Sequence, residues 1–214
     1  MKKIFAILVL LATPAFAANV ALPPLKEKAV GIPDAALVKK VENYLNGMKT
    51  FEAEFGQATS DNSLSSGRFY LQRPGKFRWE YLVGQQVLII GNSTQIVYYD
   101  RKLDEVTYIP TQYSIATFLA NENIKLSGDI KIVSLTEDEK QIRLIVTQTK
   151  KPDEGSIALY FNKDPMKLTH LEAFDQDKNL TAVAFKNQKV NAPIGKDMFV
   201  FKDPKFYKDV WKKK

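Results

Sequence analysis

The chain has 214 residues, of which 45% are hydrophobic and 26% are charged, and its formal net charge is +7. This length suits one domain with a real core, and after the N-terminus no run reaches the about 18 apolar residues that suggest a membrane-spanning helix. The single histidine, His170, and the absence of cysteine exclude Cys/His catalysis and multi-histidine metal sites. The positive charge suits an anionic lipid surface or an acidic partner, and a merely soluble basic protein is the alternative. Because the N-terminus described next predicts export, nucleic acid is not an expected partner.

Residues 1–17 have the features of a secretory signal peptide. A basic start (residues 1–3) precedes an apolar run (residues 4–11) and a small-x-small cleavage site (residues 15–17). We expect cleavage after Ala17 and export to the periplasm. Because no cysteine stands at the cleavage site, we expect no lipid anchor there, and a protein that is soluble after export.

The next segment leads into one predicted domain. Residues 18–33 contain two prolines and no hydrophobic period, which predicts a flexible N-terminal segment, and residues 34–214 form the single domain. Asp34 is a good N-cap for a helix that reaches about Met48. Its apolar residues recur at spacings of three and four, which predicts one buried stripe: Leu37, Val38, Val41, Tyr44, Leu45 and Met48.

Short strands then follow roughly every ten residues, which indicates an antiparallel sheet, sandwich or barrel rather than βαβ units. The expected strands are Phe51–Phe55, Ser66–Arg73, Lys76–Tyr81, Gln86–Ile90, Gln95–Tyr99, Val106–Ile109, Ile130–Leu135, Gln141–Thr147, Ser156–Phe161, Leu168–Phe174, Thr181–Val190 and Phe199–Phe201. An amphipathic helix, Gln112–Asn121, interrupts them. It either caps the sheet as ordinary core or acts as a movable lid over a pocket.

The most informative stretch is the hairpin around Pro74-Gly75. Proline presets φ and glycine accepts the positive φ that follows, so the pair predicts a tight turn. After it, Phe77, Trp79 and Tyr81 alternate with charged residues, which places three rings on one strand face. Arg73 stands at the turn beside that face, and its guanidinium is either solvated or used to hold another group.

Enzyme hypotheses find little support in the residues present. The chain has no Gly-x-Ser-x-Gly elbow and no glycine-rich phosphate loop, and its carboxylate pairs fall in predicted turns. His170 lies in a strand pattern and is predicted to be a surface residue. We therefore expect a binding protein without a cofactor, a metal site or an enzymatic activity, with a periplasmic enzyme or sensor domain as the rival class.

Three motifs resemble the periplasmic outer-membrane lipoprotein carrier family, the Lol carriers. The motifs are Phe55-x-Gln57, then Gly67-x-Phe69-x-Leu71-x-Arg73-Pro74-Gly75-x-Phe77-Arg78-Trp79-x-Tyr81, and then Gly91-Asn92 before Ile96-x-Tyr98-Tyr99-Asp100. The resemblance runs from the first helix to about Phe201. It implies an α+β, mainly β fold, in which an incomplete antiparallel barrel is covered by a lid of short α-helices around a hydrophobic cavity.

The resemblance also implies a function and partners. Members of the family accept lipoproteins from an inner-membrane ABC exporter and pass them to an outer-membrane receptor lipoprotein, so we expect a soluble, monomeric periplasmic carrier of lipoprotein acyl chains. The alternative on the same fold is a carrier of phospholipid or glycolipid. The arginine at the position of Arg73 is implied to hydrogen-bond lid carbonyls and to hold the empty cavity shut.

Strand parity and helix spacing predict the residues that line the cavity. They are Val38, Leu45, Phe55, Phe77, Trp79, Ile115 and Phe118. The alternative is that these side chains pack a closed core that has no room for a ligand.

Overall fold

A computed structural model describes residues 34–111 and 115–205. The first element is α1 (Ala35–Gly47), and the Asp34 carboxylate caps it by accepting a hydrogen bond from the Ala36 backbone N–H at 2.8 Å. Its buried face and its bounds agree with the predicted amphipathic helix to within a residue, because capping and spacing act locally. On the opposite side, Lys39 and Lys40 are exposed.

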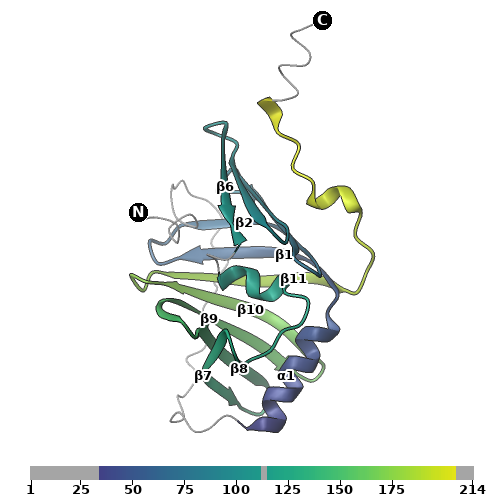
Figure 1. Ribbon diagram of the computed structural model, residues 1–214, viewed down its shortest axis with the longest axis vertical. Coiled ribbons are helices and arrows are strands. Elements are labelled where there is room, and N and C mark those ends of the chain that lie inside the picture. The colour runs from purple at the N-terminus through teal and green to yellow at the C-terminus, as the bar shows by residue number, and fades with distance from the viewer. Residues whose placement is uncertain (1–33, 112–114, 206–214) are drawn as a thin grey trace, which may run out of the picture.

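All eleven strands of the described residues form one antiparallel sheet (Figure 1). Their bounds are β1 (Thr50–Thr59), β2 (Leu64–Gln72), β3 (Lys76–Val83), β4 (Val87–Gly91), β5 (Gln95–Asp100), β6 (Glu105–Pro110), β7 (Ile130–Glu137), β8 (Gln141–Gln148), β9 (Lys151–Lys163), β10 (Met166–Asp175) and β11 (Leu180–Val190). The strand order is β6-β5-β4-β3-β2-β1-β11-β10-β9-β8-β7. The edge strands β6 and β7 do not pair with each other, so the sheet is an incomplete barrel, as predicted.

Two short helices lie against one face of this sheet (Figure 1). One is α1, and the other is η3 (Ile115–Ala120), which arises between β6 and β7. η3 is a 3-10 helix rather than the predicted α-helix. η3 has six residues, which is longer than most 3-10 helices, and it lies in a connection between strands, where 3-10 turns are frequent. Residues 112–114, which begin the predicted helix, lie outside the described residues.

The predicted last strand, Phe199–Phe201, is wrong. The chain forms a 3-10 helix there, η4 (Lys196–Phe199), and then continues without strand pairing. Both edges of β11 are already occupied by β1 and β10, so the segment that follows has no free edge beside it to pair with. It instead crosses the outer side of the sheet, where the Phe201 ring lies 5.5 Å from the Tyr99 ring.

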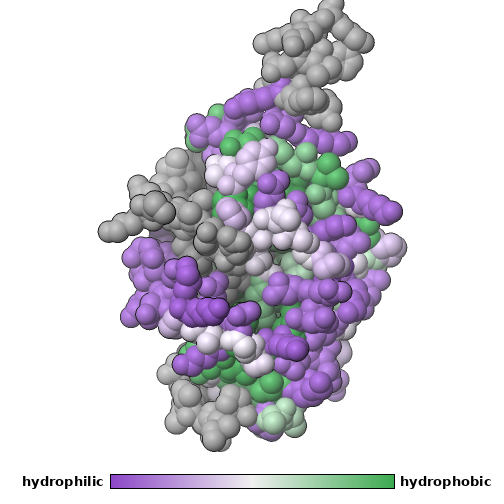
Figure 2. Space-filling view, viewed as in Figure 1, coloured by the Kyte–Doolittle hydropathy of each residue, from purple (hydrophilic) through white to green (hydrophobic). Residues whose placement is uncertain are grey.

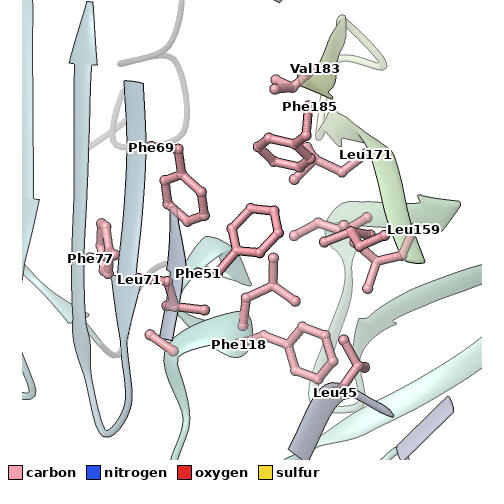
Figure 3. Packing of buried hydrophobic residues seen from close by; sticks show 14 of the residues in the cluster. Leu45, Phe51, Phe69, Leu71, Phe77, Phe118, Leu159, Leu171, Val183 and Phe185 are labelled. Atoms are coloured by element: carbon pink, nitrogen blue, oxygen red, sulfur yellow. The ribbon is translucent and has the colours of Figure 1, made fainter. Parts of the chain in front are cut away.

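The main core lies between the inner face of the sheet and the two covering helices (Figure 3). Side chains of β1 and β2 alternate between buried and more exposed positions, because successive residues of a strand point to opposite faces. Figure 2, drawn from the same direction as Figure 1, shows hydrophilic residues over much of the visible surface. No helix among the described residues is long and apolar enough to cross a membrane.

Candidate functional site

The predicted cavity residues come together on the inner side of the sheet. Leu45, Phe55, Phe77 and Phe118 are buried in the main hydrophobic cluster, and Val38 and Trp79 pack against it while remaining half-buried. These residues come from α1, β1, β3 and η3, so four separate elements meet here. The side chain of Ile115 lies outside the described part of the structure. That these residues bind a ligand stays a prediction.

Several further aromatic side chains complete the same face. Phe51 lies on the face of β1 that carries Phe55, and Phe69 lies beside it on the inner face of β2. Phe185 faces both from β11 (Figure 3). The centroid of the Trp79 ring lies 4.2 Å from that of Phe69 and 5.0 Å from that of Phe55. The predicted alternation in β1 already placed Phe51 with Phe55, whereas the approach of Phe185 depends on the pairing of β11 with β1.

Phe77 owes its position to a glycine on the neighbouring strand. Gly91 lies opposite Phe77, and a Cβ at Gly91 would lie 2.0 Å from the Phe77 ring. The ring therefore lies across bare backbone at the end of β4. Such a close approach is open only to a residue without a side chain.

Arg73 joins the β2–β3 turn to both covering helices. Its Nε donates to the carbonyl of Leu119 in η3 at 2.9 Å, and its Nη1 donates to the carbonyl of Leu45 in α1. Both acceptors lie in the last turn of their helices, where carbonyls lack an intrahelical partner. The side chain is thus buried and used, rather than solvated at a hairpin corner.

This position has an electrostatic cost. Burial lowers the pKa of the Arg73 guanidinium to about 10, because desolvation disfavours the charged form. The group is still charged at neutral pH. Its Nη2 is buried without a hydrogen-bond partner, so the site holds the cation with fewer bonds than the guanidinium can make.

The covering elements are also fastened to one another. The Asn46 side chain exchanges hydrogen bonds of 2.9 and 2.8 Å with the backbone of Ile124, and the Glu42 carboxylate accepts from the Leu126 N–H at 2.8 Å. These bonds join α1 to the segment that follows η3. We call α1, η3 and the connecting residues 121–126 the lid.

A second contact joins the lid to the hairpin turn. The Gly75 N–H donates to the Ala120 carbonyl at 2.7 Å, next to the bond that Arg73 makes to Leu119. A pocket of about 200 Å³ opens beside this contact. The residues that line it are Gly75, Asn92, Ser93, Thr111, Thr117, Ala120 and Asn121. The lid is therefore attached at the Arg73 end of the hairpin by short polar bonds.

The single histidine, His170, was predicted to be a surface residue. It lies on the outer side of β10, but it is half-buried there. The His170 ring stacks on the Tyr160 ring at 4.0 Å, and burial lowers the pKa of His170 to about 4. The Tyr160 hydroxyl donates to the Glu172 carboxylate at 2.7 Å. Among the described residues, no cluster of histidine and carboxylate side chains could hold a metal ion.

The fold and the site define a class of protein, a half-barrel whose apolar inner face is covered by helices that the buried Arg73 and the Gly75 backbone attach to a hairpin turn. Residues 46–202 match the family model described as outer membrane lipoprotein carrier protein LolA. The chain belongs to this family.

Relatives of similar length match over nearly the whole chain. The outer-membrane lipoprotein carrier protein of Chromobacterium violaceum is 29% identical over 213 residues, which cover 96% of each chain. The carrier protein of Methylococcus capsulatus is 27% identical and covers 89% of this chain and 95% of its own. The crystal structure of a LolA superfamily protein from Nitrosomonas europaea has a TM-score of 0.46 and 8% identity, and covers 80% of this chain and 99% of that chain.

Proposed function

We propose that the protein is a periplasmic carrier that buries the acyl chains of lipoproteins between the sheet and the lid, and that it acts by binding alone. The observation that carries the proposal is the aromatic inner face under a lid that the buried Arg73 side chain and the Gly75 backbone attach to the hairpin turn. The family supports it, because the relatives named above are called lipoprotein carriers.

The physical need for such a carrier is large. Each methylene exposed to water costs about 0.8 kcal/mol, so two or three acyl chains cost tens of kcal/mol. The inner face offers mostly rings and branched aliphatic side chains, which suit hydrocarbon without binding one shape tightly. Cargo held in this way can be given up without ATP.

Arg73 is proposed to act as the lid latch. When the interior is empty, its bonds to Leu45 and Leu119 favour the closed lid. Cargo that wedges the lid away from the sheet breaks these bonds, and their return on unloading favours release. We propose that an inner-membrane ABC exporter loads the carrier and that an outer-membrane receptor lipoprotein unloads it.

Trp79 allows a direct test. The chain has two tryptophans, so a Trp211→Phe variant reports on Trp79 alone. We expect its emission to shift when a triacylated lipopeptide is added, because acyl chains would displace the surrounding rings, and to stay unchanged with the same peptide without acyl chains. A response to phospholipid but not to the lipopeptide would favour the alternative, a carrier of other lipids. No response to either would contradict the proposed function.

A further inference from the structure

A polar pair lies within the apolar inner face. Gln57 and Tyr81 are 3% and 2% exposed, and the Tyr81 hydroxyl donates to the Gln57 amide oxygen at 2.8 Å. Gln57 lies on the same face of β1 as Phe55, and the Tyr81 ring meets the Phe55 ring edge-on at 5.1 Å. The Gln57 Nε2 has no hydrogen-bond partner. A buried amide donor without a partner is rare in folded proteins.

The partner of the amide oxygen fixes which way the amide points. Burial raises the pKa of the Tyr81 hydroxyl, so it stays protonated and remains a donor. In the structure the amide oxygen of Gln57 faces Tyr81, and its NH₂ group faces away. The residues paired with Gln57 on the neighbouring strands are Ser65 and Val183, neither of which is cationic. The site therefore offers a neutral donor to a neutral acceptor.

The pair lies far from the latch. Ser65, which pairs with Gln57, precedes Arg73 by eight residues along β2, a separation of about 26 Å for an extended strand. Between the two ends, β1 and β2 contribute Phe51 and Phe69 to the inner face. The interior is thus apolar in its middle, with a neutral amide donor at one end and the guanidinium at the other.

We propose that the Gln57 amide donates a hydrogen bond to the ester carbonyl of a bound acyl chain, whose hydrocarbon then lies along the aromatic residues toward the lid. This rests on the proposed carrier function and adds an orientation and a selectivity to it. An acyl chain has one strong acceptor, its carbonyl, and that acceptor would satisfy the unpaired donor. A free carboxylate fits less well, because burying an anion beside a neutral amide is costly.

The test compares two lipids that differ only in the carbonyl: a diacylglycerol and the dialkylglycerol ether with the same chains. Affinities are measured from Trp79 emission in the Trp211→Phe chain. We expect the diester to bind about threefold to tenfold more tightly, the effect of one neutral hydrogen bond. Gln57→Leu should remove this preference and leave the affinity for the ether lipid unchanged. Gln72→Leu is the control, because it removes a partly buried glutamine of β2 next to Arg73 and should keep the preference.

Each outcome decides the proposal. The proposal is overturned if the chain with Gln57 unchanged binds the two lipids equally, or if the preference for the diester survives Gln57→Leu. Either result would leave the carrier function intact. Binding of neither lipid would instead contradict the carrier function itself. The comparison without any change at Gln57 keeps the proposal testable if Gln57→Leu does not fold.

Discussion

Replacing Arg73 by leucine should loosen the lid without unfolding the sheet. The substitution removes the hydrogen bonds to the carbonyls of Leu45 and Leu119. Leucine still fills part of the space between the hairpin turn and the lid. The Gly75 bond to Ala120 and the bonds between α1 and the residues after η3 remain.

The size of the effect follows from two opposing terms. Hydrogen bonds from a charged group are worth about 1.5–3 kcal/mol each, so two contribute about 3–6 kcal/mol. Burial of the charged guanidinium opposes these bonds. The fall in the Arg73 pKa from 12.5 to about 10 corresponds to a desolvation cost of at most about 3 kcal/mol. Solvent near the turn reduces this cost. With the burial cost reduced to about 2 kcal/mol, about 1–4 kcal/mol remains for the latch, so its loss should raise the open population about 5- to 900-fold.

Hydrogen exchange measures this opening directly. In Arg73→Leu we expect amides of α1 and η3 to exchange faster by that factor, while amides of β8 and β9 keep their protection. Loading from the exporter should persist, and transfer to the receptor should fall, because relatching no longer favours release.

Arg78→Leu is the matched control. Arg78 lies five residues away in β3, and it bonds to Glu80 and to the Met198 carbonyl rather than to the lid. Its loss should leave lid exchange and transfer unchanged. Unaltered lid exchange in Arg73→Leu, or normal transfer at normal loading, would refute the latch.

Three further predictions concern stability. Gly91→Ala should lower the free energy of unfolding by about 1–3 kcal/mol, because the new methyl group clashes with the Phe77 ring. Gly56→Ala is the control, since a Cβ at Gly56 meets no other atom. Equal urea midpoints for the two variants would contradict this prediction. Phe51→Ala should cost about 3–5 kcal/mol, because its ring is fully buried at the centre of the inner face, and a loss below 1 kcal/mol would show that the site collapses freely. Because the pKa of His170 falls from 6.5 to about 4 on folding, the unfolded chain binds more protons between these values, so stability should decline as the pH falls from 6.5 to 4. Urea midpoints at pH 7.5 and 4.5 check this, and His170→Gln should show a smaller decline.

Local patterns predicted much of the fold. The cap at Asp34 and the spacing that follows it specify α1 to within a residue, and the alternation around the Pro74-Gly75 turn specifies the β2–β3 hairpin. In both cases the interacting residues are close in the sequence. The regular spacing of the strands predicted an antiparallel sheet, sandwich or barrel, and the family resemblance implied that the barrel is incomplete, as observed.

Features that depend on distant partners were harder to predict. The Arg73 bond to Leu119 spans 46 residues, and only the family resemblance pointed to lid carbonyls as its acceptors. The polar pair joins residues 24 apart on strands that are not neighbours, and no local pattern marks it. The stretch at Phe199 has the composition of a strand, but it has no free sheet edge to pair with.

The most direct test of the carrier function is the mass of what the protein holds when it is isolated from the periplasm under native conditions. The account predicts a triacylated polypeptide that co-purifies with the protein, and more of it with Arg73→Leu, because unloading is impaired. Free phospholipid or glycolipid alone would shift the function to the alternative carrier. Protein that carries nothing apolar, in both forms, would contradict the account.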